Sequence, residues 1–412
     1  MRKVDVLIVG AGPAGSSTAA FLAHAAPALT DRILIVDRER FPREKFCAGG
    51  VGARADKLLG SIGITVDVPS VWIDGIAFRA MGRTTTVREP GIGRVVRRVE
   101  FDHELARQAR ARGLDLSDDT RVLGLTRQAD GWEVETSRGR IRARVVVGAD
   151  GVQSVVRRSL GFAATRYRAQ AIEVDTEPVD ADPPRDILLF DATHRELPGY
   201  YWDFPTLVGG RAMVVRGVYV LRASDAPVQV EIQSVLEREL AARGIDLSKL
   251  KKKRYAELAF DPHLPVSRQG VLLVGEAAGI DPVTGEGIAQ AIQYGATAGR
   301  YLARKLSERD FAFEDWPSEI RWNSIGRDLL VRNLGVPLIY GAPRANVEHF
   351  LHECPDFIRI GTQHFAGKRW SKAALARATC QALLHTAGFV LGKTPQAEEG
   401  AVPAGEPEAR ES

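Results

Sequence analysis

The stretch VDVLIVGAGPAGSSTAAFLAHAA, Val4 to Ala26, decides the fold of the first part of the chain. Its apolar run predicts a buried β-strand, and the small and apolar residues after the glycines predict an α-helix. Between them, Gly10, Gly12 and Gly15 have the spacing G-x-G-x-x-G. A strand, a glycine turn and a helix in this order predict a dinucleotide-binding βαβ unit.

The residues of this turn have separate physical roles. Gly10 allows the tight turn, Gly12 lets the backbone approach a pyrophosphate, and Gly15 lets the helix pack on the strand. Free N–H groups at the start of the helix, beside Pro13 and Ala14, attract phosphate oxygens, and the helix dipole adds to this attraction. We therefore assign all five residues to a dinucleotide-binding site.

A second predicted strand, RILIVDR, supplies the next part of this unit. It ends near Asp37, about 20 residues past the glycine turn, where an acidic residue binds a ribose hydroxyl. Arg38 follows directly, and we assign it to the same site.

Two later segments favour FAD over NAD. RVVVGADGVQSVVRRSLG predicts a strand that ends in the residues from Gly148 to Asp150 and Gly151, followed by the start of a helix. QGVLLVGEAAGIDPVTGEGIAQAIQYGATAG predicts a strand that ends at Gly275 and Glu276, then a loop and a helix from about Gly285. An NAD domain needs no further strand this late, whereas a larger cofactor that crosses the whole domain does. We therefore predict noncovalent FAD.

Composition narrows the class of protein. The 412 residues are 45% hydrophobic and 26% charged, as in soluble globular proteins. The net charge of +4 is too weak to indicate nucleic-acid binding. The three cysteines lack metal-ligand spacing, so we predict no metal, and their odd number argues against a disulfide framework. A reducing, cytoplasmic setting fits best.

The stretch PGYYWDFPT, Pro198 to Thr206, is the densest group of aromatic residues in a chain that is only 7% aromatic. On a strand, Tyr200, Trp202 and Phe204 point to one face, because side chains alternate with a period of two. With Pro205 they would form an apolar wall for a hydrophobic substrate. The alternative is an ordinary strand that faces the core.

The three glycine-containing segments, in this order, resemble the superfamily of FAD-dependent monooxygenases and reductases with the para-hydroxybenzoate hydroxylase-like fold, over about residues 1–300. Asp37 stands where that family more often has glutamate, and Glu276 where it usually has aspartate. The resemblance implies that Glu276 lies on the ribityl or pyrophosphate side of FAD.

Two further segments extend the resemblance. RVVRRVEFDHELARQA resembles the start of a family helix, which implies that Arg98 lies along the isoalloxazine-to-ribityl part of FAD. DPVTGEGI resembles the loop that faces the flavin N1–C2=O edge, which implies flavin contacts for a set of four residues, Pro282, Gly285, Gly287 and Ile288. Free N–H groups and the helix dipole there would favour anionic reduced flavin.

Two motifs resemble the geranylgeranyl reductase branch of this superfamily. FPREKFCAGGVGARA contains Cys47, Ala48 and Gly49, which resemble that branch's cysteine motif beside the flavin. The stretch from Tyr200 to Pro205 fits its pattern Tyr-x-Trp-x-Phe-Pro, which lines the substrate cavity. The resemblance implies reduction of prenyl C=C bonds, with hydride from the flavin to one carbon and a proton to the other. Cys47, Tyr200 or an ordered water are candidates for the proton source, and a packing role for Cys47 stays open.

The expected fold is α/β, with a Rossmann-like FAD-binding domain, an inserted and mostly antiparallel β-sheet substrate domain, and a C-terminal helical region. We expect the FAD-binding domain at residues 1–67, 92–160 and 266–310, and the sheet domain at residues 68–91 and 161–265. Residues 311–393 are expected to be helical, with Trp316, Trp322 and Trp370, and residues 394–412 to be a disordered tail.

The expected partners are a prenyl-containing small molecule or lipid and an electron donor, either transient NAD(P)H or another reductant. The basic run from Lys249 to Arg254 is either a solvated surface or a contact with a membrane surface. Two other functions stay open. One is an FAD-dependent monooxygenase, hydroxylase- or halogenase-like, that acts on an aromatic or polyketide-like metabolite, and the other is a non-catalytic flavin-binding protein.

Overall fold

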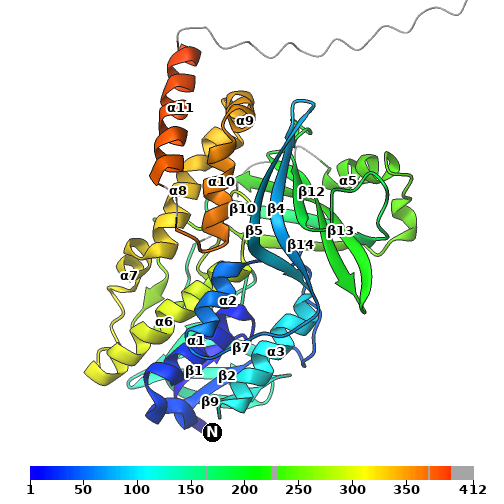
Figure 1. Ribbon diagram of the computed structural model, residues 1–412. Helices are drawn as coiled ribbons and strands as arrows, with labels where there is room; N and C mark the ends of the chain where they lie inside the picture. The colour runs from blue at the N-terminus through cyan, green and yellow to red at the C-terminus, as the bar shows by residue number, and fades with distance from the viewer. Residues whose placement is uncertain (164, 224–230, 370–371, 391–412) are drawn as a thin grey trace, which may run out of the picture.

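The structure of the chain is a computed structural model that describes residues 1–163, 165–223, 231–369 and 372–390, with side chains described up to residue 382. Trp370 and the expected tail at 394–412 lie outside the described residues. Two eight-stranded sheets dominate the molecule. In Figure 1 the first sheet lies at the base and the second lies above it. Beside the second sheet stand four helices, α8 (Ser324–Ile339), α9 (Arg344–Glu353), α10 (Pro355–Phe365) and α11 (Lys372–Val390).

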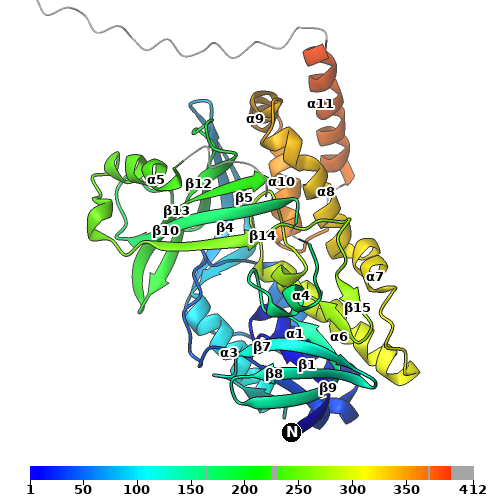
Figure 2. The ribbon, with the colours of Figure 1, turned by 180° about the vertical axis from the view of Figure 1, so that it is seen from behind.

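The first sheet contains the predicted βαβ unit. Its central order is β15-β16-β9-β1-β2-β6, in which β16, β9, β1, β2 and β6 are parallel. Figure 2 shows β7 and β8 beside β9, with which β8 pairs in antiparallel fashion. The strands are β1 (Arg2–Val9), β2 (Ile33–Val36), β6 (Asp115–Ser117), β7 (Val122–Gln128), β8 (Gly131–Thr136), β9 (Gly139–Gly148), β15 (Ser267–Arg268) and β16 (Val271–Leu273).

Close helix packing covers one face of this sheet. Helix α1 (Pro13–Ala25) is rich in alanine and serine, and it packs along α6 (Ile288–Glu308). A Cβ atom at Gly299 would lie 2.6 Å from the backbone nitrogen of Leu22, so only glycine allows this approach. Helix α3 (Arg98–Ala111) packs beside α1, and the short α4 (Val155–Ser159) follows β9.

The second sheet has the order β14-β10-β13-β12-β11-β4-β5-β3. All neighbouring strands are antiparallel except β11 and β4, which are parallel. Helix α5 (Ile232–Ala241) packs on β13 and β10. The strands are β3 (Gly50–Gly52), β4 (Ser70–Ala80), β5 (Arg83–Val96), β10 (Tyr167–Thr176), β11 (Ile187–Asp191), β12 (Gly199–Val208), β13 (Arg211–Ala223) and β14 (Lys253–Leu258).

Strand pairing crosses two of the domain boundaries that we expected. Strand β3, within the expected range 1–67, pairs with β5 in the second sheet. Strand β5 continues to Val96, past the expected boundary at residue 92. Segments 43–52 and 92–98 therefore pass directly between the two sheets.

The C-terminal helices pack against both sheets. Helix α10 contacts β5, where a Cβ atom at Gly93 would lie 2.9 Å from the Phe365 ring, and a Cβ atom at Gly52 on β3 would overlap the Phe365 carbonyl oxygen. These helices confirm the predicted C-terminal helical region, and the two sheets confirm the predicted fold class. The remaining helices are α2 (Ala53–Gly60), α7 (Trp316–Trp322) and the 3-10 segments Pro27–Arg32, Leu247–Lys249 and Gly275–Ala277.

Candidate active site

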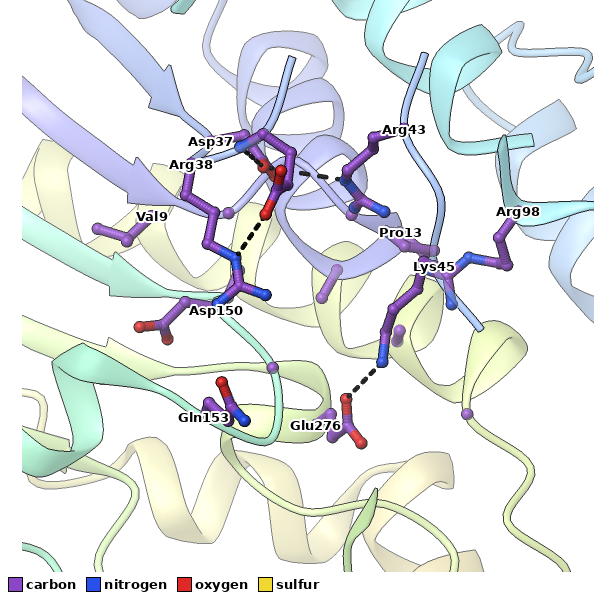
Figure 3. A pocket seen from close by; sticks show the side chains of 18 of the residues that line it. Val9, Pro13, Asp37, Arg38, Arg43, Lys45, Arg98, Asp150, Gln153 and Glu276 are labelled. Atoms are coloured by element: carbon purple, nitrogen blue, oxygen red, sulfur yellow. Dashed lines mark hydrogen bonds and ion pairs between the residues drawn. The ribbon is translucent and has the colours of Figure 1, made fainter. Parts of the chain in front are cut away.

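A cavity of about 370 Å³, which we call the central cavity, lies where the first sheet meets the second. Its walls come from the ends of β1 and β2, the start of α1, segment 43–47, the start of α3, the loop after β9, strand β14 and the loop before α6. Its volume lies within the range of ligand pockets. Figure 3 shows charged side chains pointing into it from several of these segments.

Most residues that we predicted to bind the cofactor line this cavity, although they come from five separate parts of the chain. They are Gly10, Gly12, Pro13, Ala14, Asp37, Arg38, Cys47, Arg98, Asp150, Gly151, Glu276, Gly285, Gly287 and Ile288. The described residues that line it do not include Gly15, Ala48, Gly49, Gly275, Pro282 or the predicted substrate residues Tyr200, Trp202, Phe204 and Pro205.

The glycines behind the cavity wall set its shape by close packing. A Cβ atom at Gly15 would overlap the carbonyl oxygen of Gly10, and one at Gly49 would overlap that of Val96. At Gly275, with φ of +59°, a Cβ atom would lie 2.6 Å from that of Ala14. These glycines therefore act on the site through the backbone.

Asp37 is buried at the end of β2 and organises the glycine turn. Its Oδ2 accepts a hydrogen bond from the backbone N–H of Ala11 at 2.8 Å, and its Oδ1 accepts one from that of Glu39 at 2.9 Å. Arg43 lies on its other side, with Nε 3.8 Å from Oδ1 (Figure 3). The carboxylate thus ties β1 to β2 at the edge of the cavity.

Two arginines and Gly12 form a cradle for an anion. A Cβ atom at Gly12 would lie 3.5 Å from Nη2 of Arg43 and 3.8 Å from Nη2 of Arg98. The buried Asp102 holds both guanidinium groups, at 3.0 Å from Arg43 and in a bidentate pair at 2.7 Å with Arg98. Burial acts to lower the pKa of Arg98, but the Asp102 carboxylate raises it above its ordinary value. Arg98 therefore stays charged beside the start of α1.

Asp150 and Glu276, the acidic residues of the two later glycine segments, make different contacts. Asp150 accepts hydrogen bonds from the Ser154 hydroxyl at 2.5 Å and from the backbone N–H of Val155 at 2.7 Å, so its carboxylate caps α4. Glu276 faces the cavity, with Oε2 3.9 Å from Nζ of Lys45 (Figure 3). Both residues line the cavity, but the Asp150 carboxylate is already engaged by α4.

The loop before α6 is held rigid from both sides. Asp281 accepts hydrogen bonds from the backbone N–H of Val283 at 2.7 Å, and Nη1 of Arg332 on α8 lies 2.5 Å away. Gly285 has φ of +66°, a conformation that favours glycine. The helix itself begins at Ile288, later than the predicted start at about Gly285, because Gly287 is its N-cap. Gly285 and Gly287 both line the cavity.

Cys47 lies in the wall between the cavity and the second sheet. Its backbone N–H donates to Oε1 of Glu173 at 3.2 Å, and its Sγ accepts from the backbone N–H of Gly49 at 3.4 Å. Burial raises the pKa of the Cys47 thiol, so the neutral thiol is the stable form near pH 7.

Several residues at this wall were missed by the sequence reasoning. Arg43 and Lys45 lie in the segment that we singled out for its cysteine alone. Tyr255 and Glu257, on β14, line the cavity at alternate positions of the strand. The signal was an acidic residue, Glu257, between the apolar residues Ala256 and Leu258 of the stretch RYAELAF, but only the fold brings it to the cavity.

These β14 side chains meet a buried carboxylic group on the neighbouring strand. The Tyr255 hydroxyl donates to Oε2 of Glu173 at 3.2 Å. Burial raises the pKa of Glu173 to about 7. Burial, followed by the charge of Glu276, raises the pKa of Glu257 well above its ordinary value. Within the described part of the chain, the buried Oε2 of Glu257 has no hydrogen-bond partner.

The predicted substrate wall is a packed group of rings, which we call the aromatic cluster. Trp202 is only 2% exposed, and the Tyr200 and Tyr219 rings stack with centroids 5.2 Å apart. The Tyr200 hydroxyl donates to the carbonyl oxygen of Thr284 at 2.5 Å, so the cluster touches the loop before α6. As the period of two requires, Tyr201 lies on the opposite face, in the group packed with α5. The cluster comprises Phe190, Tyr200, Trp202, Phe204 and Tyr219.

Comparison with known families decides which ligand the glycine turn serves. Residues 3–312, most of the chain, match the family described as FAD binding domain. The chain belongs to this FAD-binding family. FAD is therefore its cofactor, as the two later glycine segments predicted.

The relatives of this FAD-binding protein include named reductases. It is 29% identical to menaquinone reductase of Mycobacterium tuberculosis over 77% of this chain and 79% of that protein. It is 28% identical to digeranylgeranylglycerophospholipid reductase 2 of Methanosphaera stadtmanae, over 76% and 81%. A geranylgeranyl bacteriochlorophyll reductase-like protein of Thermoplasma acidophilum has the same fold, with a TM-score of 0.75, 21% identity, and coverage of 96% of this chain and 100% of that one.

Proposed function

We propose that the protein reduces C=C bonds of a prenyl chain with reducing equivalents carried by FAD. The observation that carries this proposal is the contact between the aromatic cluster and the loop at 284–287, which also lines the central cavity. A redox cofactor and an apolar chain can meet there without water between them. Two relatives of the chain, menaquinone reductase and digeranylgeranylglycerophospholipid reductase 2, are reductases, which supports this class of reaction.

The residues of the central cavity fit FAD part by part. The backbone at Gly12 and the start of α1, with Arg43 and Arg98, would hold the pyrophosphate. Asp37 would bind a ribose hydroxyl, and Glu276 with Lys45 would face the ribityl chain. The backbone N–H groups of Gly285 and Gly287, which line the cavity, would bind the flavin edge. When bound and reduced, FAD supplies the hydride for the reaction.

The aromatic cluster would bind the prenyl chain along the face of Tyr200, Trp202 and Phe204, with Pro205 at its end. Val336 of α8 and Phe365 of α10 pack against the same cluster. A substrate chain can reach the rings only if these helices shift outward. We therefore assign α8 and α10 as the moving cover of the substrate site.

A lipid substrate would be taken from a membrane surface, and α8 offers a docking face for it. Val331, Leu334 and Leu338 are 70%, 74% and 53% exposed and lie at helical spacing on one face. Arg327 is exposed on the same face and suits an anionic headgroup. The basic run that we considered for this role is not a single surface, because Lys253 is buried and lies 2.5 Å from Asp175. Among the described helices, none is both long and apolar enough to span a bilayer.

Cys47, at the cavity wall, would lie beside the flavin and the incoming alkene. Its neutral thiol suits a proton relay better than a thiolate nucleophile. The electron donor is transient NAD(P)H or another reductant.

The test compares reduced protein incubated with a prenyl lipid, with and without oxygen. Saturated product formed without oxygen supports the proposal. Product that requires oxygen would instead support a monooxygenase, and no product in either condition would support a flavin-binding protein without turnover. Vesicle co-sedimentation of Leu334→Ser against wild type checks the docking face.

A further inference from the structure

We propose that Glu257 is the catalytic acid of this reaction, and that its carboxyl group donates the proton to the alkene carbon that does not receive the hydride. The assignment rests on the proposed reduction of prenyl C=C bonds. It names a residue that neither the glycine motifs nor the cysteine motif contains.

The position of Glu257 carries the argument. A Cβ atom added at Gly285 would lie 2.6 Å from Oε2 of Glu257 and 2.9 Å from the Tyr219 ring. The carboxyl group and the aromatic cluster therefore converge on one glycine of the loop that lines the central cavity. Hydride and proton must reach adjacent alkene carbons, so an acid for this reaction has to lie at such a junction.

The hydroxyl groups around this junction already donate to other acceptors. Tyr200 donates to the carbonyl oxygen of Thr284 at 2.5 Å, and Tyr219 donates to that of Pro282 at 3.1 Å. Tyr255 donates to Glu173. Burial raises the pKa of each of these phenols well above its ordinary value. Tyr200, one of the proton donors that we considered from the sequence, is therefore a poor acid.

The surroundings of Glu257 favour its protonated form. Its Oε2 is buried and, among the described residues, accepts no hydrogen bond, which is costly for a carboxylate. The charged groups that act on it are the carboxylates of Glu276, Asp281 and Glu173, which favour protonation, and the Lys45 ammonium group, which opposes it. Burial and the nearest carboxylate outweigh the lysine, so the pKa is raised. The group therefore keeps a proton to donate at neutral pH.

The proton transfer balances with the proposed reduction. The O–H bond of Glu257 breaks, and the π electron pair of the alkene forms a C–H bond with that proton. The adjacent carbon, now electron-deficient, accepts the hydride that the reduced cofactor supplies. The carboxylate left on Glu257 takes a proton from water after the product leaves.

The experiment compares wild type, Glu257→Gln and the exposed control Glu237→Gln in a single anaerobic turnover of reduced protein with prenyl lipid. Glutamine keeps the size of the side chain but has no acidic proton. We expect Glu257→Gln to keep its FAD and to reduce the alkene roughly 100- to 10,000-fold more slowly, the usual contribution of a general acid. Glu237→Gln should match wild type.

A second readout needs neither FAD turnover nor substrate. The infrared spectrum of wild type near pH 7 should contain a protonated carboxyl band that Glu257→Gln lacks and Glu237→Gln retains.

In wild type, the turnover rate should fall as pH rises through the raised pKa of this acid.

The outcomes separate the two proposals. Saturated product at the wild-type rate from Glu257→Gln overturns the role of Glu257 alone, as does an infrared spectrum in which wild type and Glu257→Gln have the same protonated carboxyl bands. A wild-type protein that holds FAD but saturates no prenyl lipid overturns the proposed function, whatever the infrared spectrum shows.

Discussion

The central cavity and the aromatic cluster lie side by side on the loop at 284–287, yet they are built in opposite ways. The cavity has open volume, and ion pairs fix some of its charged side chains, as Asp102 does for Arg43 and Arg98. The rings of the cluster pack against one another, with Trp202, Phe204 and Tyr219 buried and with Phe190 and Tyr200 half-buried. The cavity is thus preformed for a resident cofactor, whereas the proposed site for an apolar chain would have to open before the chain could enter.

The largest effects are expected at Gly15 and Gly12 of the first motif. The Gly15 variant tests the packing of α1, and the Gly12 variant tests the binding of FAD. Gly15→Val should cost more than about 3 kcal/mol of folding free energy, because its side chain would overlap the Gly10 carbonyl. Gly12→Val should fold with a change below about 1 kcal/mol, since a Cβ atom there has only ordinary contacts. It should nevertheless lose FAD, because its side chain occupies the anion cradle. Denaturant unfolding and flavin absorbance measure both, and a Gly12→Val protein with full FAD would disprove the cradle.

The next effect concerns the aromatic cluster. Trp202→Ala should destabilise the fold by about 3–5 kcal/mol, as expected for a buried tryptophan. The matched control is Trp322→Ala, which should stay within about 0.5 kcal/mol because this side chain is 70% exposed. Unfolding of both variants is measured in urea. Equal stability of the two variants would mean that the cluster is an open cavity wall and not a packed core.

A smaller effect is expected at Glu173, which lies between the two regions. Its pKa in the folded protein is about 7, whereas an ordinary glutamate has a pKa of about 4.3. Between these values the folded state binds more protons than the unfolded state, so the free energy of unfolding falls as pH rises. Glu173→Gln should remove this slope and stabilise the protein at pH values above 7 by on the order of 1–3 kcal/mol. A variant whose stability falls with pH as steeply as wild type would rule out this site as the cause.

The smallest effect on stability is expected at Cys47. Cys47→Ser should keep its FAD and change the folding free energy by less than about 1 kcal/mol, because the thiol makes one weak contact with a backbone N–H. If the thiol relays a proton, anaerobic turnover should still fall. Iodoacetamide should modify the exposed Cys380 faster than Cys47, whose pKa is raised by burial. Full turnover by Cys47→Ser would leave Cys47 as a packing residue.

Local sequence determined a large part of this protein. The G-x-G-x-x-G turn, the acidic residue after β2 and the two later glycine segments were sufficient to predict the FAD-binding family and the fold class, because these features depend on short-range backbone geometry. The alternation of Tyr200, Trp202 and Phe204 likewise follows from the period of a single strand. Each of these inferences needs only residues that are close together in the chain.

Only the tertiary structure decided which distant side chains contact these motifs. Arg43 meets Arg98 through Asp102, and Glu257 meets Gly285, although these partners are far apart in the sequence. Whether the aromatic residues are packed or open also depends on α8 and α10, which follow more than a hundred residues later. The free energy of a buried charge or ring is set by the groups that surround it in space, and no local pattern in the sequence specifies those groups.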